Sequence, residues 1–450
     1  MGSHRALWVA SVAQLVVVVD VSVVNVALPS MQQDLRLGVA MTSWVAMGYS
    51  VAFAGALLAA ARVADGMGAA RVLLWSTVAF TGASILGGLA VTGWMLVVAR
   101  IGQGLAAAAL SPATFTLLTV TYREGPDRTR AIALWTAVSV AGGGIGNVVS
   151  GALTEFSSWR SVLLINVPIG VLVVVASRVL ISRRPTPVAR VRWSSVAASI
   201  LAFGSAVYAL SLFAERGRIT GPVLVAVALS VALTVAWVRQ DRSSAVPLIP
   251  SSLWLRPNIA LGTAATALTA ICFQVSIWYF LTFRLQRDWG YSPVETGLAF
   301  LPLTVSLLVV NLAVVPRLLG RVGARVLITV GALVAAAGVW WIGWSTTGDF
   351  AQAVLGPSLV IGIGGGLMNT PLATVVTSGV AQEEAGAASG LMNTAKQFGG
   401  AVGLSAATAA TTVSGDERAS YVVMVAALVA AAGFAMLFRT ASTASVEKGW

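Results

Sequence analysis

In VVVVDVSVVNVALP, at residues 16–29, one carboxylate interrupts an apolar segment long enough to cross a membrane. A carboxylate in the middle of a membrane helix costs about 2.5 to 3.5 kcal/mol on insertion scales, so such a residue is by default a functional hypothesis. We therefore interpret Asp20 as a site residue. Its expected role is to carry a proton.

Composition extends the membrane interpretation to the whole chain. Of 450 residues, 57% are hydrophobic and only 10% are charged, and long apolar runs recur throughout, as is typical of polytopic membrane proteins. The first run is longer than a signal-peptide core and ends without an A-x-A pattern, so we expect it to be a retained span. The single cysteine, Cys272, excludes an intramolecular disulfide and argues against a cysteine-based metal cluster.

Apolar runs between turn and charge clusters predict fourteen membrane-spanning helices, so the predicted fold class is an all-α polytopic membrane protein. Six spans are expected near residues 6–28, 44–63, 72–91, 94–119, 131–153 and 161–181. Two more are expected near 193–214 and 219–238, and six more near 259–283, 294–315, 322–344, 351–376, 387–413 and 421–438. The predicted domains are an N-terminal six-helix bundle (1–181), a linker with two inserted helices (182–254), a C-terminal six-helix bundle (255–440) and a cytoplasmic tail (441–450).

The distribution of basic residues predicts the orientation. With a cytoplasmic N-terminus, the inner loops and tails hold 19 of the 28 Lys and Arg residues, against 7 outside and 2 within spans. Basic residues concentrate on the cytoplasmic side of membrane proteins, so both termini are expected in the cytoplasm and the protein in the cytoplasmic membrane. Topology and contact with anionic lipid explain the net charge of +12, and no nucleic acid is expected.

Two pairs of segments repeat between the halves. ARVADGMGAARVLL at 61–74 has the same pattern as PRLLGRVGARVLI at 316–328, and both are expected to be loops. GLAAAALSPATFTLLTV, from Gly104, is echoed by GIGGGLMNTPLATVVTSG, from Gly362, with Pro112 opposite Pro371. Halves with repeats of the same sense are typical of transporters.

The motifs in these segments resemble those of the major facilitator superfamily. Residues 61–71 resemble its signature G-x-L-a-D-r-x-G-r-k, and RIGQG at 100–104 resembles its fourth-helix motif R-x-x-q-G. VDVSVVNVALP at 19–29, and WR at 159–160 followed by NVPIG at 166–170, resemble motifs of its fourteen-helix drug:proton antiporters. The resemblance implies the major facilitator fold, with two six-helix bundles plus two inserted helices, and proton-driven multidrug efflux.

The resemblance also implies gating roles for two groups of residues. In the loop at 61–71, the charge and turn character of the signature is kept by Arg62, Asp65, Gly68 and Arg71, with departures at Gly66, Ala69 and Ala70. In the fifth span, the antiporter motif G-P-x-x-G-G is GNVVSG at 146–151, where Asn147 replaces the proline. The glycines there that permit close packing and bending are Gly142, Gly146 and Gly151. Packing without gating remains the alternative for these glycines.

Depth along the helices brings two intramembrane charges to one level. Asp20 lies eight residues before Leu28 and Arg100 six residues after Trp94, which is about 12 Å and about 9 Å from the expected outer ends of their spans. A nearby guanidinium favours an ionised carboxylate and desolvation disfavours it, so a change of access would switch Asp20 between proton release and uptake. The two residues are our proton-coupling hypothesis, and a static ion pair is the alternative.

The residues expected to line the substrate cavity include one further charged side chain and several amides. Lys396 either neutralises an anionic substrate or favours an outward-facing state, or it snorkels to the cytoplasmic face. The remaining cavity candidates are Gln14, Asn25, Gln103, Asn147, Gln274, Trp278, Asn311, Asn369 and Asn393. Trp278 alternatively belongs to an interfacial aromatic belt. Membrane acids are almost absent apart from Asp20, which disfavours lipophilic dications and leaves a neutral or weakly acidic drug as the expected substrate.

The sequence predicts a secondary active transporter rather than an enzyme, because its glycine clusters lie in apolar runs and no GKS or GKT phosphate loop is present. The predicted function is proton-coupled antiport that exports a lipophilic drug or antibiotic by alternating access and confers resistance. Expected partners are the small lipophilic substrate, protons and the lipid bilayer, with no metal, no cofactor beyond the proton gradient, and a monomeric state. The alternatives are a proton-linked or passive importer of a small organic solute, and a non-transporting membrane sensor of a lipophilic ligand.

Overall fold

The computed structural model describes residues 2–123, 125–180, 193–243, 247, 249–345, 349–380 and 384–438. Within these ranges the chain is almost entirely helical and forms no β-strand. Apolar segments fold this way in a membrane because, without water, every backbone N–H and C=O group must find its partner inside the segment. The predicted all-α fold class is confirmed.

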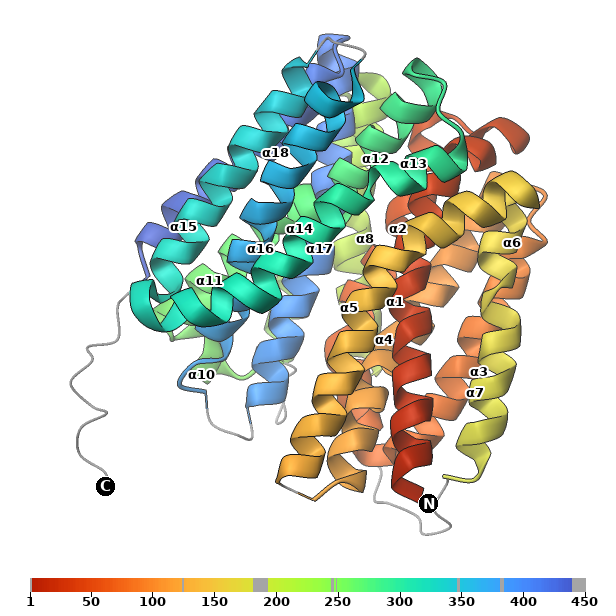
Figure 1. Ribbon diagram of the computed structural model, residues 1–450, viewed down its shortest axis with the longest axis vertical. Helices are drawn as coiled ribbons and strands as arrows, with labels where there is room; N and C mark the ends of the chain where they lie inside the picture. Colours follow the sequence, from red (N-terminus) through yellow and green to blue (C-terminus); the bar gives the residue numbers. More distant parts are fainter. Residues whose placement is uncertain are drawn as a thin grey trace.

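The N-terminal half forms one bundle of helices (Figure 1). Its helices are α1 (Gly2–Asp34), α2 (Val39–Met67), α3 (Ala69–Gly88), α4 (Gly93–Thr121), α5 (Pro126–Phe156), α6 (Trp159–Leu164) and α7 (Asn166–Arg178). The span expected at 161–181 is observed as α6 and α7, which join at Ile165, whose φ of −59° and ψ of −26° are helical. The chain therefore continues as one helix into Asn166, the first residue of α7.

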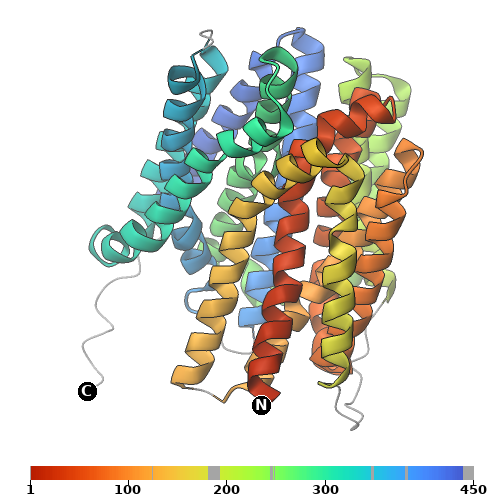
Figure 2. The ribbon, with the colours of Figure 1, turned by 45° about the vertical axis from the view of Figure 1, so that its right-hand side comes forward.

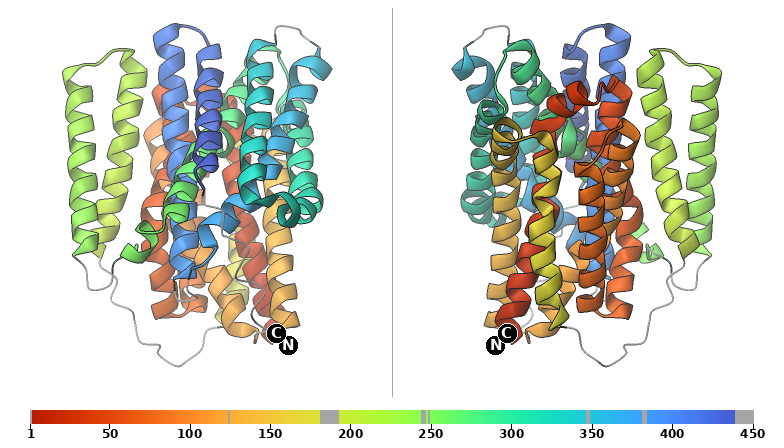
Figure 3. Two further views of the ribbon diagram at one scale, coloured as in Figure 1. Left: turned by 90° about the vertical axis from the view of Figure 1, so that its left-hand side faces the viewer. Right: turned by 90° about the vertical axis from the view of Figure 1, so that its right-hand side faces the viewer.

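Two further helices stand together at one side of the molecule (Figure 3). They are α8 (Trp193–Arg216) and α9 (Gly221–Arg242), which pack on each other. Helix α8 also packs on α2 and on α17 (Ala385–Ser414), so the pair contacts both halves of the chain. The backbones of α2 and α8 approach closely at Gly55, where a Cβ atom would lie 2.7 Å from the Cα atom of Ile200.

The C-terminal half is a second bundle in which several helices contain short π-helical turns. It comprises α10 (Ser251–Trp254), α11 (Pro257–Ala270), η1 (Ile271–Ser276), α12 (Ile277–Phe283), η2 (Arg284–Asp288), α13 (Pro293–Ala299), α14 (Leu301–Val309), η3 (Val310–Val314), α15 (Val315–Trp344), η4 (Ala351–Leu355), α16 (Gly356–Thr377), α17 and α18 (Arg418–Met436). The segments α11, η1, α12 and η2 follow one another without a break, so the helix expected to end at Phe283 continues to Asp288.

Twelve helices in the described residues are long and apolar enough to cross a membrane, which makes this a multi-pass membrane protein. One of these stretches, Pro293–Trp344, has 52 residues and changes direction at Gly323. Helix α17 has 30 residues but is not among the twelve, since Lys396 and many Gly, Ser and Thr residues lower its hydropathy. The predicted number of fourteen spans, like the predicted domain boundaries, stays a prediction.

The two repeated segments differ from the loops expected of them. Residues 61–67 belong to α2 and residues 316–322 to α15, so each segment consists of two helices that meet at one glycine. These glycines, Gly68 and Gly323, occupy equivalent positions of the repeat, with φ of +89° and +79°. Only glycine adopts such angles without strain. The prediction of loops was wrong because the residues around each glycine are mostly good helix formers.

The two bundles lie side by side (Figure 1, Figure 2) and meet mainly where α17 packs on α2 and where α13 packs on α5. The contact between α5 and α13 lies near the C-terminal end of α5, on the side predicted to be extracellular. There a Cβ atom added to Gly297 would lie 2.6 Å from the Asn147 carbonyl oxygen, and one added to Gly151 would collide with the Pro293 carbonyl. Two glycines, one from each bundle, therefore let these helices touch.

Candidate functional site

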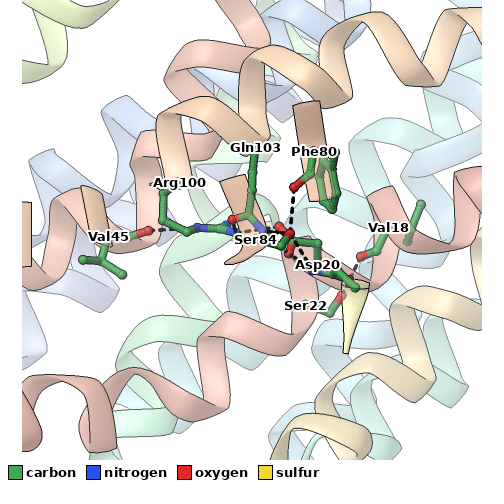
Figure 4. A network of polar contacts seen from close by, with 9 residues as sticks. Val18, Asp20, Ser22, Val45, Phe80, Ser84, Arg100 and Gln103 are labelled. Atoms are coloured by element: carbon green, nitrogen blue, oxygen red, sulfur yellow. Dashed lines mark hydrogen bonds and ion pairs between the residues drawn. The ribbon is translucent and has the colours of Figure 1, made fainter. Parts of the chain in front are cut away.

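The centre of the candidate site is the carboxylate of Asp20 in α1, which is completely buried (Figure 4). Its Oδ2 atom lies 2.5 Å from Nη1 of Arg100 in α4. Its Oδ1 atom accepts hydrogen bonds from Nε2 of Gln103 at 2.8 Å and from Nδ2 of Asn166 at 2.7 Å. The carboxylate therefore receives three N–H donors from two other helices, α4 and α7, and this geometry suits its ionised form.

A second layer of contacts holds the donors in place. Nη1 of Arg100 also donates to Oε1 of Gln103 at 2.8 Å, and its guanidinium lies 4.9 Å from the ring centroid of Tyr49 in α2. Nε2 of Gln103 donates to Oγ of Ser84 in α3 at 2.9 Å, and that hydroxyl donates to the Phe80 carbonyl. The network thus fixes four helices of the N-terminal bundle around α1.

The electrostatics follow from burial. Arg100 is 1% exposed and Asp20 is 0% exposed, so neither charge is hydrated. Removing one partner of such a pair leaves an uncompensated buried charge, which typically costs about 3 to 5 kcal/mol. The structure brings together the two residues that the depth argument placed at one level. The proton-coupling role assigned to them stays a prediction.

Sequence reasoning missed three members of the network, namely Asn166, Ser84 and Tyr49. Asn166 was noted only as part of the motif at 166–170, with no role attached. A signal was present, because an amide inside an apolar run needs a polar partner. Its partner could not be derived, because counting residues along a span does not give the rotation of the helix about its axis, which directs Asn166 toward Asp20.

The N-terminal cavity candidates separate in the structure. Gln103 belongs to the Asp20 network rather than to a cavity wall. Oε1 of Gln14 accepts a hydrogen bond from Thr114, whose hydroxyl also accepts one from Trp135 Nε1. Asn25 and Asn147 are buried, and Oδ1 of Asn147 has no hydrogen-bond partner among the described residues.

The C-terminal candidates are likewise dispersed. Nε2 of Gln274 donates to Oε1 of Gln397 at 3.0 Å, while Trp278 donates to the Phe273 carbonyl and stacks edge-on against Phe300. The three asparagines have different surroundings. Asn311 accepts from the backbone and hydroxyl of Thr370, Asn393 donates to the Ser389 carbonyl, and Asn369 is exposed. Lys396 is half-buried and makes no hydrogen bond or ion pair within the described part of the chain.

Two cavities lined by described residues lie at other places. One, of about 310 Å³, lies between α2, α8 and α17 and is lined by Gly38, Val39, Ala40, Ser43, Ser211, Ala214, Glu215, Ser405, Thr408 and Thr412. The other, of about 610 Å³, lies beside α13 and α14 and reaches Tyr291 and Phe350. None of the predicted cavity residues lines either one. Among the described residues, no cluster of three or more His, Cys, Asp and Glu side chains is arranged to hold a metal ion.

The residues predicted to gate fall into three groups. Gly142 and Gly146 pack α5 against α1, since Cβ atoms there would lie 2.8 Å from Leu15 and 2.7 Å from Ser22, within one bundle. Gly151 instead faces the other bundle, at Pro293. In the first repeated segment, Gly68 makes the turn and Arg71 lies in the first turn of α3. The side chains of Arg62 and Asp65 lie outside the described residues.

Two helical bundles related by a parallel repeat, with a buried charge pair in one of them, define a transporter rather than an enzyme. The chain belongs to the Major Facilitator Superfamily, whose family profile matches residues 10–404. The fold is also that of a bacterial homologue of the human lysosomal transporter Spinster, crystallised in an inward-facing and unoccupied conformation. The TM-score is 0.64 at 16% identity, over 97% of this chain and 96% of that one.

Several curated relatives match most of the chain. The cephamycin export protein of Amycolatopsis lactamdurans is 46% identical over 404 residues, which cover 89% of this chain and 83% of the relative. The puromycin resistance protein of Streptomyces alboniger is 36% identical, with 91% and 81% covered. The lincomycin resistance protein of Streptomyces lincolnensis is 31% identical, with 89% and 83% covered.

Proposed function

We propose that this transporter exports a lipophilic antibiotic across the cytoplasmic membrane in exchange for protons and thereby confers resistance. The relatives are named for antibiotic export and resistance, which supports the direction of transport and the kind of substrate. The buried carboxylate of Asp20, held by donors from α4 and α7, is the observation that supports proton coupling.

In the proposed mechanism, the proton acts by releasing α1. Ionised Asp20 holds α1 to α4 and α7 through three hydrogen bonds. Two of the donors are neutral amides, and the third is the charged guanidinium of Arg100. Protonation removes the charge that Arg100 faces, so the hold on α1 weakens. Substrate transport then requires that this change reaches the contact between the bundles.

Helix α1 provides the connection. Six residues beyond Asp20, about 9 Å along the axis, the Val26 carbonyl accepts a hydrogen bond of 2.9 Å from Gln286 in the other bundle. Between them, the Val23 carbonyl accepts from Ser150 of α5, the helix that touches α13. A shift of α1 on protonation would therefore disturb both contacts that close the side predicted to be extracellular. In this proposal the conformation described is closed on that side.

The remaining parts of the proposal concern location and assembly. We place the protein in the cytoplasmic membrane with both termini in the cytoplasm, acting as a monomer and driven by the proton gradient alone. The excess of basic residues in the loops expected to be cytoplasmic supports this orientation.

The deciding experiment uses proteoliposomes with an imposed pH gradient and a pH-sensitive dye inside. Puromycin, lincomycin and a cephamycin are added in turn to the wild type and to Asp20→Asn, and the proton flux that each compound evokes is recorded. Asp127→Asn is the matched control, because Asp127 is an exposed acid at the start of α5. Thermal unfolding and drug binding of each variant establish that it is folded.

The proposal expects drug-evoked proton flux in the wild type and the control, and none in folded Asp20→Asn that still binds drug. Equal flux in both variants would remove Asp20 from the coupling role. Drug transport by the wild type that does not depend on the pH gradient would contradict proton coupling. Absence of transport of any compound would contradict export.

A further inference from the structure

Among the described residues, Lys396 carries an intramembrane charge that lies outside the Asp20 network. Of the three charged residues placed well within the spans, Asp20 and Arg100 neutralise each other at 2.5 Å. Lys396, in α17 of the other bundle, has no carboxylate partner within the described ranges. The membrane interior of the transporter therefore has a positive charge on the C-terminal bundle that nothing in those ranges compensates.

Snorkelling does not account for this lysine. Helix α17 has 30 residues, and Lys396 lies within about four residues of its middle, so its Cα atom is about 5 Å from the bilayer centre if the helix is centred. The edge of a hydrocarbon core of about 30 Å is then roughly 10 Å away along the axis. A lysine stem extends only about 6 Å, so the ammonium group stays inside the apolar region.

The surroundings of Lys396 supply hydrogen-bonding groups beside the charge. Gly400 and Gly403 continue its face of α17 toward the other end and pack against η1, where Cβ atoms would lie 2.5 Å from Gln274 Cβ and from Ile271 Cα. The next residue, Gln397, is bonded to Gln274 at 3.0 Å. Lys396 thus precedes by one helical turn the point at which α17 packs on Gln274 of η1, a short π-helical turn of the kind frequent at functional sites.

We propose that Lys396 binds the acidic group of the transported molecule, so that the preferred substrates of this exporter are amphipathic anions. This inference rests on the proposed export function and specifies its substrate class. An unpaired lysine in a membrane helix costs several kcal/mol in the empty protein, and an entering carboxylate or sulfonate group offsets that cost. A cationic drug gains nothing there and is repelled.

The chemistry of the lysine side chain further defines which anionic groups Lys396 is expected to bind. An ammonium group is a compact charge with three donors, so it binds any single anionic group without demanding the planar geometry that a guanidinium favours. Arginine at this position should consequently keep the preference for anions, whereas a neutral glutamine should abolish it. The pair Lys396→Arg and Lys396→Gln separates charge from mere side-chain length.

The experiment compares two probes that share one aromatic framework. Purified protein in lipid nanodiscs is titrated with anilinonaphthalene sulfonate, which is anionic, and with phenylnaphthylamine, which is neutral, and binding is followed by probe fluorescence. The same probes are used for export from proteoliposomes with a pH gradient. Arg418→Gln, which removes one exposed positive charge at the start of α18, is the control for net charge.

The expected result is that Lys396→Gln weakens binding of the anionic probe at least about tenfold, which corresponds to about 1.4 kcal/mol, and leaves the neutral probe unchanged. Lys396→Arg and Arg418→Gln should keep wild-type affinities. A wild type that binds the anion no better than the neutral probe, including one that binds neither, overturns the proposal, as does equal weakening of both probes in Lys396→Gln. Export of the neutral probe without any anion preference would reject this inference alone, whereas no export of any probe or antibiotic rejects the proposed function.

Discussion

Asn166 donates a hydrogen bond of 2.7 Å to Oδ1 of Asp20, although the two residues are 146 positions apart in the chain. The bond joins the first helix of the N-terminal bundle, α1, to the last, α7. It completes the set of donors around the carboxylate, since Gln103 occupies the same oxygen and Arg100 the other. The neutral amide of Asn166, like the guanidinium of Arg100, therefore contacts the Asp20 carboxylate directly.

Replacing Asn166 with leucine should destabilise the transporter and impair coupling together. A hydrogen bond to a charged group contributes about 1.5 to 3 kcal/mol, and leucine has nearly the same size but no donor. We expect a lower midpoint of thermal unfolding and slower proton-driven export. A double-mutant cycle with Asp20→Asn should give a clearly non-zero interaction energy.

The control for this variant is Asn369→Leu, since Asn369 is an exposed amide in α16. It should leave stability and export near wild type. Additive effects of Asn166→Leu and Asp20→Asn in the cycle would mean that the two side chains do not act as a unit.

The site was partly predictable from the sequence because membrane helices obey a simple length rule. Counting residues from the ends of two spans placed Asp20 and Arg100 at one level, and they are in contact. Rotation of a helix about its axis is not given by such counting. For that reason Gln103 was assigned to a cavity that it does not line, and Asn166, which donates to Asp20, received no role.

The fold, like the site, was only partly predictable from the sequence. Apolar periodicity identified the helices, and the repeat identified the two equivalent glycines, Gly68 and Gly323. The expectation of loops at those glycines was wrong, because a single glycine with positive φ is enough to turn the chain between two helices. The partners of α5 were also beyond the sequence, since Gly142, Gly146 and Gly151 look alike until their neighbours are known.

Closure between the bundles should depend on Gly151 and Gly297. Alanine at either position would bring a Cβ atom into a backbone carbonyl of the facing helix, at Pro293 or at Asn147, and rigid backbone cannot yield as a side chain can. We expect Gly151→Ala and Gly297→Ala to push α5 and α13 apart and to favour the conformation open on the predicted extracellular side.

The measurement is the labelling rate of a cysteine placed at Ala299, which is 3% exposed at the end of α13. A membrane-impermeant maleimide is added outside, in a background where the buried native Cys272 is changed to alanine. Labelling should accelerate at least about tenfold, equivalent to about 1.4 kcal/mol in the opening equilibrium. Gly433→Ala, whose Cβ would meet no atom within 4 Å, should change nothing. Unchanged labelling in Gly151→Ala would show that this contact does not close the protein.

Glu417, in the turn before α18, should make stability depend on pH. Partial burial raises the pKa of its carboxyl group, the charge of Asp288 raises it further, and Arg284 and Arg287 oppose these effects. A carboxyl group with a raised pKa in the folded state stabilises the fold when protonated, and that stability is lost as the pH rises through the raised value. Glu417→Gln should therefore unfold at a slightly higher temperature than the wild type at neutral pH, and at the same temperature near about pH 4.

The effect at Glu417 should be small, because the side chain remains accessible to solvent and its charge is screened. Asp127→Asn removes the same charge from an exposed residue of another helix and is the control for net charge. A Glu417→Gln variant that is less stable than the wild type at neutral pH would mean that the attraction of the two arginines outweighs the cost of burial.

Trp159 and Arg160 both hold Asp34, at the end of α1, but they should not contribute equally. Nε1 of Trp159 donates to Oδ2 of Asp34 at 2.9 Å, and the indole is only 4% exposed. Nη1 of Arg160 reaches the same oxygen at 2.7 Å, but the side chains of this ion pair are 35% and 46% exposed. A partly buried hydrogen bond from a neutral donor is screened less by salt than an exposed ion pair.

Trp159→Phe should therefore cost about 1 kcal/mol at any ionic strength, since the apolar ring is kept and only the donor is lost. Arg160→Gln should cost less than about 1 kcal/mol at low salt, and still less at high salt. Chemical unfolding of both variants at two salt concentrations measures the difference. If Arg160→Gln proved the more costly change at high salt, the second hydrogen bond of Arg160, from Nη2 to the Ala90 carbonyl at 3.1 Å, would be the reason, because it joins the segment after α3 to α6 without a second charge. The ranking thus decides whether this end of α1 is held by the charge of Arg160 or by the buried indole beside it.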